Sequence, residues 1–334
     1  MRFDRLLSCV DAHAAGEPLR IIMSGMPQLR GETILARRKD MREHHDQIRR
    51  QLLFEPRGHA DMYGAVLTPP VSAGADFGVI FLTNEGYSTM CGHGVIALTT
   101  VLLETGVMPR VAPETEIVYD SPAGLIRARA GIEGDRVTGI AFANVPAFRF
   151  AQGVEVETSR GGQCVDVAFG GAWYAIVAAE NLGLKVEPAQ VTDLIQLGME
   201  IKRAVDLQLN TRHPLEPTIV GIYGTIITGP PLRDGAQGRN VTIYAEGAVD
   251  RSPCGTGTSA RLACLFADGE IGLNEPYVHE SIIDTTFSGS VLETATVGGI
   301  PAVVTEIRGR GFLTGFHQFV IDPADPVRDG FLVR

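Results

Sequence analysis

Residues 91–106 read CGHGVIALTTVLLETG, and residues 254–269 read CGTGTSARLACLFADG. Aligned without gaps, the two stretches agree at Cys91/Cys254, Gly92/Gly255, Gly94/Gly257, Ala97/Ala260, Leu102/Leu265 and Gly106/Gly269. Each stretch follows a strand-like run, FGVIFLTNEG or RNVTIYAEGA, and continues with apolar residues at helical spacing. The sequence therefore predicts the same series twice: a strand, a loop, a Cys-Gly-x-Gly turn and a helix.

A cysteine at the start of a helix has a particular chemistry. It faces backbone N–H groups without acceptors and the positive end of the helix dipole, and both favour thiolate over thiol. Glycines directly after it let a ligand approach the backbone, so the same N–H groups can hold a carboxylate. Cys91 and Cys254 are therefore the candidate functional residues, one in each half of the chain.

Two such thiols suit proton transfer at a carbon atom. The ordinary thiol pKa of about 8.5 can be brought towards neutrality, where general acid–base catalysis is efficient. One thiolate would remove a proton and the other thiol would deliver one from the opposite face, which inverts a stereocentre. A cysteine hydrolase using Cys91 and His93, or a thiol-bearing binding protein, leaves the second cysteine unexplained. Cys9, Cys164 and Cys264 lack this context and are expected to be structural.

Composition narrows the class of protein. The chain has 334 residues, enough for about two domains, and a net charge of −10, which argues against nucleic acid or an anionic membrane as partner. It contains no apolar run of transmembrane length and no signal-peptide pattern, so we expect a cytoplasmic protein with reduced thiols.

No cofactor and no metal are expected. The glycine loops match neither the P-loop nor the dinucleotide-binding pattern. Only three lysines are present, which gives a pyridoxal phosphate Schiff base little support. The histidines do not have the spacing of a metal site; they are His13, His59, His93, His213, His279 and His317, with the His44–His45 pair on a helix surface.

The remaining pattern indicates a duplicated α+β architecture. Residues 5–23 predict a strand hairpin, residues 34–53 one amphipathic helix with His44, His45 and its arginines in solvent, and residues 191–205 another helix. Residues 229–239 predict an exposed loop. Strand-like segments follow each Cys-initiated helix, so the repeat extends beyond the helices.

At these residues the sequence resembles the proline racemase family, which includes proline racemases, hydroxyproline 2-epimerases and trans-3-hydroxy-L-proline dehydratases. The segments that carry the resemblance are DAHAAGEPLRI at 11, EPRGHADMYGA at 55, NEGYSTMCGHG at 84 and DRSPCGTGTSA at 250. The resemblance implies an α+β fold like that of diaminopimelate epimerase. It has two similar lobes, each a curved, mostly antiparallel sheet around a central helix, with the active site in the cleft between them. We expect residues 1–150 plus 312–334 to form the lobe with Cys91, and residues 151–311 the lobe with Cys254.

The resemblance also implies roles for individual residues. Cys91 and Cys254 would be the acid/base pair acting on Cα without a cofactor. Backbone N–H groups around Gly92, His93, Gly255 and Thr256 would bind the substrate carboxylate, and Gly257 would permit its close approach. Asp250 and His93 would receive the ring amine; the alternatives are an ordinary turn residue for Asp250 and a histidine satisfied by its neighbours for His93.

Two further segments match the family less decisively. His13, Glu17 and Arg20 fit its N-terminal pattern and would either wall the site or form a structural turn. Tyr63 would either line the pocket or belong to the core.

The reaction is left open between two members of the family. Much of the chain resembles the dehydratases, in which a threonine typically replaces the second cysteine, whereas this chain has Cys254. We therefore favour racemisation or epimerisation of proline or a hydroxyproline. Dehydration of trans-3-hydroxy-L-proline is the alternative, because both reactions begin by removing the same proton. The expected partner is this small molecule alone, and the protein is a possible homodimer.

Overall fold

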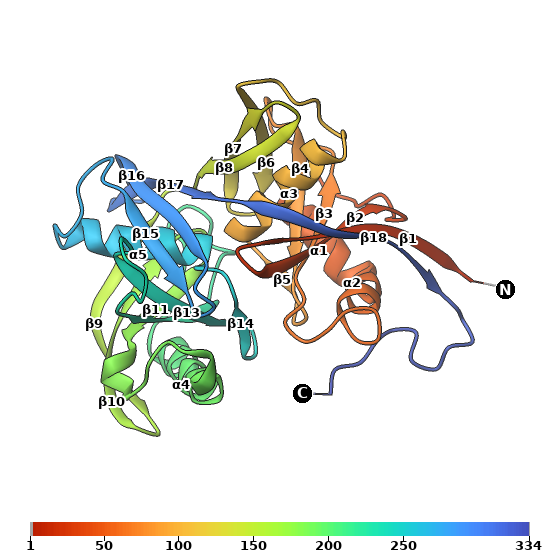
Figure 1. Ribbon diagram of the computed structural model, residues 1–334. Helices are drawn as coiled ribbons and strands as arrows, with labels where there is room; N and C mark the ends of the chain where they lie inside the picture. Colours follow the sequence, from red (N-terminus) through yellow and green to blue (C-terminus); the bar gives the residue numbers. More distant parts are fainter. Residues whose placement is uncertain (1–2, 334) are drawn as a thin grey trace. The chain divides into compact units, whose positions relative to one another are not determined.

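The computed structural model describes residues 3–333. The chain divides into two compact units, Met1–Ile140 with Arg310–Arg334 and Ala141–Gly309 (Figure 1). Each unit builds its own set of paired strands on its own Cys-initiated helix. Among residues 3–333, no helix has both the length and the hydrophobicity needed to cross a bilayer.

The first unit contains the N-terminal hairpin and the last strand of the chain. Its strands are β1 Arg5–Ala14, β2 Glu17–Ser24, β3 Gly64–Thr68, β4 Phe77–Leu82, β5 Tyr87–Ser88, β6 Glu114–Ser121, β7 Gly124–Glu133 and β18 Gly311–Ile321. Its helices are α1 Ile34–His44, α2 Asp46–Leu53 and α3 Gly92–Glu104. Strand β8, Arg136–Ala143, contains the point in the sequence, after Ile140, where the first unit ends and the second begins.

The second unit contains the remaining elements. Its strands are β9 Phe148–Thr158, β10 Gly161–Phe169, β11 Trp173–Ala178, β12 Gly224–Gly229, β13 Gly238–Tyr244, β14 Ala248–Asp250, β15 Tyr277–Ser281, β16 Thr286–Val297 and β17 Ile300–Gly309. Its helices are α4 Val191–Gln208 and α5 Gly255–Ala267, with short 3-10 turns at Ala179–Leu182 and Pro188–Gln190.

The strands of the two units pair in the same order. In the first unit, β1–β2, β3–β4, β4–β5 and β6–β7 are antiparallel, while β2–β3 and β4–β6 are parallel. In the second unit, β10–β11, β12–β13, β13–β14 and β15–β16 are antiparallel, while β11–β12 and β13–β15 are parallel. The sequence repeat is thus a repeat of topology, with helices α1 and α2 or helix α4 inserted between the first parallel pair.

Each of the two central helices is covered by strands of its own unit, and its apolar sequence suits this burial. Helix α3 packs on β1, β2 and β18, and its residues from Gly92 to Leu103 are all buried. Helix α5 packs on β9, β10, β16 and β17. Such all-round burial is the signature of a core helix rather than an amphipathic surface helix.

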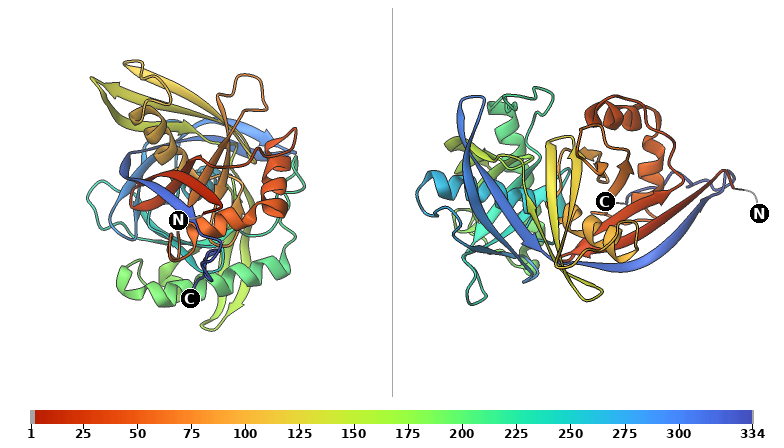
Figure 2. Two further views of the ribbon diagram at one scale, coloured as in Figure 1. Left: turned by 90° about the vertical axis from the view of Figure 1, so that its right-hand side faces the viewer. Right: turned by 90° about the horizontal axis from the view of Figure 1, so that it is seen from above.

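Helix α4 is amphipathic and lies on the other face of the second unit's sheet. A Cβ atom at Gly198 would come within 2.8 Å of Ile243 on β13. The alternate residue, Thr242, pairs with Ile226, which contacts α5 at Gly257. Because successive strand residues face opposite sides, α4 and α5 cover opposite faces of β13. In Figure 2, α4 is the long green helix of this unit.

Most element predictions are confirmed, and one is wrong. The hairpin and helix α4 lie where the pattern placed them, and so does the loop before β13 except at Gly238 and Arg239, which begin β13 and are buried. Residues 34–53, however, form two helices that break at His45. Arg49 is also not solvated: it is buried, pairs with Asp46 at 2.7 Å and donates to the Thr83 carbonyl at 2.9 Å.

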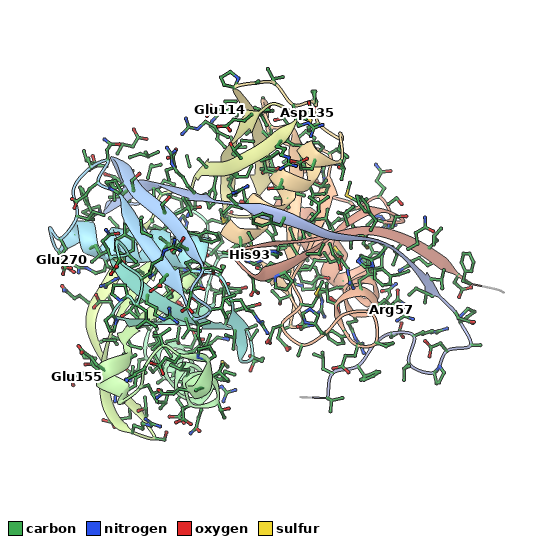
Figure 3. The ribbon with its side chains drawn as sticks, viewed as in Figure 1. Arg57, His93, Glu114, Asp135, Glu155 and Glu270 are labelled. Carbon is green, nitrogen blue, oxygen red and sulfur yellow. The ribbon has the colours of Figure 1, made fainter. Side chains whose placement is uncertain are left out.

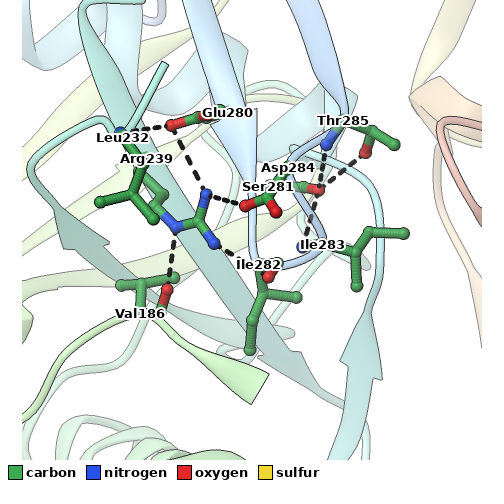
Figure 4. A network of polar contacts seen from close by, with 9 residues as sticks. All are labelled: Val186, Leu232, Arg239, Glu280, Ser281, Ile282, Ile283, Asp284 and Thr285. Atoms are coloured by element: carbon green, nitrogen blue, oxygen red, sulfur yellow. Dashed lines mark hydrogen bonds and ion pairs between the residues drawn. The ribbon is translucent and has the colours of Figure 1, made fainter. Parts of the chain in front are cut away.

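A buried arginine ties the parallel strands β13 and β15 together (Figure 4). Arg239 donates to the carbonyl oxygens of Val186 at 2.8 Å and Ile282 at 2.9 Å. It also contacts Asp284 at 2.7 Å and the buried Glu280 at 3.5 Å. The guanidinium, carried by β13, therefore has partners on β15, in the turn that follows β15 and in the loop before α4.

Candidate active site

Cys91 is the N-cap of helix α3, as the sequence predicts. Its Sγ atom accepts a hydrogen bond from the backbone N–H of Gly94 at 3.2 Å. Its backbone, at φ −145° and ψ 111°, is in the ordinary extended region. The thiol is buried, with 4% of the residue exposed.

His93 is the nearest titratable group to this thiol. Its Nδ1 atom lies 3.2 Å from Cys91 Sγ, and its ring meets the Tyr63 ring edge to face at 4.8 Å (Figure 3 labels His93). Burial lowers the pKa of His93 to about 3, against a weaker opposing hydrogen bond to Pro18. The ring is therefore neutral at physiological pH and carries a single N–H. With this N–H on the Pro18 carbonyl, the other ring nitrogen is an acceptor for the thiol proton of Cys91.

Cys254 is the N-cap of helix α5 and repeats the contact of Cys91. Its Sγ atom accepts from the backbone N–H of Gly257 at 3.3 Å. Its backbone differs, however, because φ is +61° with ψ 107°, a region that residues with a Cβ rarely adopt. Strain of this kind persists only where neighbouring contacts hold it, and it clusters at active sites.

The contacts that hold Cys254 come from both sides of its backbone. The Ser252 hydroxyl accepts from the Cys254 N–H at 3.1 Å and donates to Asp250 Oδ1 at 2.7 Å. The Thr258 hydroxyl donates to the Pro253 carbonyl at 3.2 Å. Asp250, which the family resemblance assigns to the ring amine, thus also makes the contacts of a turn residue.

The ionisation of Cys254 differs from the sequence prediction. Burial, reinforced by the charge of Asp250, raises the pKa of the Cys254 thiol to about 12. Burial also raises the pKa of Asp250 to about 6. The prediction that the helix start favours thiolate is therefore wrong for Cys254 in the free protein. The N–H of Gly257 does lower the thiol pKa, but desolvation outweighs it.

Tyr174 on β11 belongs to this site, and no motif or spacing in the sequence pointed to it. Its hydroxyl lies 2.6 Å from Thr256 Oγ1 and 3.7 Å from Cys254 Sγ. Desolvation raises the pKa of Tyr174 well above its usual value, so the phenol keeps its proton. It is therefore a hydrogen-bond donor held beside the thiol.

The second glycine of each Cys-Gly-x-Gly turn, Gly94 or Gly257, is required by the sulfur atom. A Cβ atom at Gly94 would lie 2.9 Å from Cys91 Sγ and 2.6 Å from the Phe81 ring. A Cβ atom at Gly257 would lie 3.0 Å from Cys254 Sγ. The glycines therefore let the helix start close on the thiol, in addition to any close approach of a ligand.

The predicted carboxylate donors occupy the first two positions of each helix. Gly92 and His93 begin α3, and Gly255 and Thr256 begin α5. Backbone N–H groups there have no acceptor within the helix. Together with the helix dipole, they make each helix start suited to a small anion.

In the N-terminal turn, the side chains of Arg20 and His13 already have partners within the protein. Arg20 pairs with Asp11 at 2.7 Å and donates to the Leu52 carbonyl at 2.6 Å. His13 Nδ1 accepts from the Gly16 N–H at 3.2 Å. The turn reaches the site through Pro18, whose carbonyl accepts from His93.

The other three cysteines and the carboxylates labelled in Figure 3 lie apart from these contacts. Cys9 and Cys264 are buried free thiols whose pKa burial raises to about 12, and Cys164 is an exposed free thiol. Within residues 3–333, no three His, Cys, Asp or Glu side chains are grouped to hold a metal ion. The carboxylates labelled in Figure 3, Glu114, Asp135, Glu155 and Glu270, are exposed.

Comparisons with known proteins agree with this arrangement. The family model described as proline racemase matches residues 9–332. A trans-3-hydroxy-L-proline dehydratase of Bacillus cereus is 47% identical over 333 residues, covering 100% of both chains. A 3-hydroxyproline 2-epimerase of Burkholderia multivorans is 46% identical over 335 residues, again covering 100% of both.

A solved structure has the same fold. The hydroxyproline epimerase of Agrobacterium vitis, with bound trans-4-hydroxy-L-proline, superposes with a TM-score of 0.95 at 33% identity, covering 100% of this chain and 96% of that one. The predicted α+β fold of two similar sheet-and-helix lobes is confirmed. The chain therefore belongs to the proline racemase family.

Proposed function

We propose that this protein inverts the Cα atom of proline or a hydroxyproline, with Cys91 and Cys254 as a cofactor-independent acid/base pair. The observation that carries the proposal is the repeated helix start. Two thiols stand at equivalent N-caps of a repeated fold, each accepting from the N–H of the glycine three residues on. A one-base reaction gives no reason for the second copy of this geometry.

The chemistry follows from the groups at each helix start. The N–H groups of Gly92, His93, Gly255 and Thr256 bind the substrate carboxylate, and Gly257 admits it closely. Removal of the α-proton places enolate-like charge on this carboxylate, and preorganised N–H donors stabilise charge that develops in the transition state. Asp250 and His93 receive the ring amine.

The two thiols enter the reaction with different roles. With its pKa near 12, Cys254 holds its proton at neutral pH and is the acid of the resting protein. Cys91, whose Sγ atom lies 3.2 Å from the neutral imidazole of His93, is the base; His93 accepts a hydrogen bond from the thiol and stays uncharged. After inversion, Cys91 carries the substrate proton and Cys254 is ionised, so one proton must move back before the next turnover in this direction.

Dehydration of trans-3-hydroxy-L-proline is the second candidate function. The observation in its favour is the 47% identity to a relative of that name. This reaction needs one base for the α-proton and a leaving hydroxyl at C3, so Cys91 alone suffices for its first step. The second thiol favours inversion as the main activity.

The remaining expectations belong to the same proposal. The functional halves are residues 1–150 with 312–334 and residues 151–311, each supplying one thiol. A small amino acid is the partner, without nucleic acid or membrane, which the net charge of −10 supports. We place the protein in the cytoplasm, where its free thiols stay reduced, with a homodimer as the assembly.

Incubation in D₂O without added cofactor tests the proposal. L-Proline, trans-4-hydroxy-L-proline and trans-3-hydroxy-L-proline are supplied separately and followed by proton NMR and optical rotation. Loss of the Cα proton signal, with rotation moving towards the other epimer, is the expected result and names the substrate. Conversion of the 3-hydroxyproline alone to an unsaturated ring product, without inversion of the other two, would favour the dehydratase.

A further inference from the structure

The face of β13 that covers α5 carries polar side chains where an apolar core is expected. Asn240 and Thr242 alternate along this face, and both are fully buried. His279 on the parallel strand β15 pairs with Gly238 and is fully buried as well. Residues that alternate along a strand, or lie opposite one another on neighbouring strands, share a face. The three side chains are here called the rear network.

The rear network lies against the first turn of α5. His279 Nδ1 is 2.9 Å from the hydroxyl of Thr258, which donates to the Pro253 carbonyl. The hydroxyl thus accepts from Nδ1–H, so Nε2 is left with a lone pair. Thr242 pairs across the strands with Asp250 and Ile226, and its hydroxyl is close enough to the Cys254 thiol to favour ionisation.

Four polar atoms of the rear network can each make a further hydrogen bond. Among the residues that the structure describes, Asn240 Nδ2, Asn240 Oδ1, Thr242 Oγ1 and His279 Nε2 are buried without a protein hydrogen bond of ordinary geometry. Buried polar atoms are rarely left so, because the loss of hydration is unfavourable. A buried water typically makes two to four hydrogen bonds to such groups, and this set offers both donors and acceptors.

We propose that Asn240, Thr242 and His279 hold bound water against the inner side of Cys254, and that this rear network lets the buried thiol lose and regain its proton. The inference rests on the proposed function, because only a thiol that cycles between two protonation states needs such a network. Thr242 donates its one hydroxyl proton to the thiolate, and the water donates to the Thr242 oxygen, which otherwise has no hydrogen-bond partner among the described residues. All three are positioning residues, since they act through Cys254.

The rear network offsets the unfavourable ionisation of Cys254. Burial and Asp250 oppose ionisation of Cys254, and a neutral partner comparable to His93 is absent at the matching position, which is Thr256. Neutral donors on the protein side stabilise a thiolate without adding another charge. The titratable groups facing Cys254 are Asp250 from β14, Tyr174 from β11 and, through Thr258, His279 from β15, with Arg251 beside Asp250 and Tyr223 beside Tyr174.

Thiol reactivity resolved by site tests the network independently of turnover. The protein is labelled with iodoacetamide across a pH series, and the rates at Cys91 and Cys254 are read separately by peptide mass spectrometry. Thr242→Val removes the donor and is expected to slow labelling of Cys254 about ten-fold at fixed pH, equivalent to about one pKa unit, and to leave Cys91 unchanged. Thr242→Ser keeps the hydroxyl and should restore the wild-type rate.

Thr211 provides a matched control. It is another buried threonine of the second unit whose hydroxyl has no partner among the described residues, and it lies outside the rear network. Thr211→Val should leave Cys254 labelling unchanged. The proposal is overturned if Thr242→Val labels Cys254 at the wild-type rate, if it slows both cysteines equally, or if Thr211→Val has the same effect.

A high-resolution crystal structure of the wild-type protein provides the second measurement, should Thr242→Val fail to fold. Water within hydrogen-bonding distance of Thr242 and of Asn240 or His279 is expected, and a dry contact there contradicts the proposal. Failure of the proposed function would look different. It would appear as a wild-type protein that exchanges no Cα proton, whatever the labelling rates are.

Discussion

The Nδ1 atom of His93 lies 3.2 Å from the Sγ atom of Cys91. At the matching position of the second helix stands Thr256, whose hydroxyl is 3.8 Å from Cys254 and bonded to Tyr174 instead. The duplicated fold therefore presents two thiols with the same helix-start geometry and different proton partners. This asymmetry distinguishes the two thiols chemically.

Cys254→Thr should separate inversion from dehydration. The change removes the second acid/base group, so inversion should fall by about 10²–10⁴-fold, the usual contribution of general acid–base catalysis. Removal of the α-proton by Cys91 remains possible, so any dehydration of trans-3-hydroxy-L-proline should persist. Polarimetry measures the first activity, and NMR detection of the unsaturated product the second.

Cys264→Ala is the control for that variant. Cys264 is a buried thiol on the same helix, away from its N-terminus. Its loss should cost stability through a small cavity and leave inversion intact. Wild-type inversion in Cys254→Thr would show that Cys254 is not the second base.

Gly94→Ala should impair the first helix start more than Gly257→Ala impairs the second. The new Cβ at position 94 meets both the Phe81 ring at 2.6 Å and the Cys91 sulfur at 2.9 Å, whereas position 257 meets the Cys254 sulfur at 3.0 Å. Gly86→Ala, where a Cβ meets nothing within 4 Å, is the control and should retain activity. Steady-state kinetics of the three variants, with circular dichroism to check folding, decides the matter. Equal activity of Gly94→Ala and Gly86→Ala would show that the sulfur contact is unimportant.

Acidification should destabilise the protein through its buried histidines. The pKa of His93 and of His279 is lowered to about 3 by burial, below the usual 6.5. Below about pH 6.5 the unfolded chain binds protons that the folded chain refuses, so the free energy of unfolding decreases as pH falls towards 3. Each histidine adds up to about 1.4 kcal/mol per pH unit to this slope. Asp250, with its pKa raised to about 6, opposes the trend between about pH 6 and pH 4.

Urea denaturation at several pH values measures the slope. His279→Asn should be less stable than wild type at pH 7 but should lose less stability on acidification. A variant whose pH slope equals that of wild type would contradict the assignment of His279 as a buried neutral imidazole.

Arg239→Leu should destabilise the second unit. The change leaves Glu280 buried without its cation and removes the donors to Val186 and Ile282 (Figure 4). Breaking a buried pair in this way costs about 3–5 kcal/mol. Asp284→Asn, at the exposed end of the network, should cost less than about 1 kcal/mol. Thermal denaturation of both variants tests the contrast, and similar losses would show that Glu280 is not the partner that matters.

The sequence predicted the parts of the site that are local in the chain. The duplicated stretch places Cys91, Cys254 and the glycines beside them, because strand, turn and helix signals all lie within residues 77–106 and again within residues 239–269. It missed the break at His45, since apolar spacing continues from Met41 through Ile48 and gives no sign that the helix stops.

Contacts between distant residues could not be predicted. Tyr174 reaches Cys254 across 80 positions of the chain, and Arg49 is buried by carbonyl groups more than 30 positions away. The direction of the Cys254 pKa was wrong for the same reason. The helix start is visible in the sequence, but the depth of burial that outweighs it depends on the whole unit.

Stereospecific exchange in the two single-cysteine variants tests the two-base account most directly. Cys91→Ala and Cys254→Ala are each incubated in D₂O with both epimers of the amino acid that the wild-type protein inverts, and loss of the Cα proton is followed by NMR. Each variant keeps one base on one face of the substrate. We predict that Cys254→Ala exchanges one epimer only, that Cys91→Ala exchanges only the other, and that neither variant inverts Cα. Exchange of the same epimer by both variants, or inversion by either at the wild-type rate, would contradict the assignment of two opposed thiol bases.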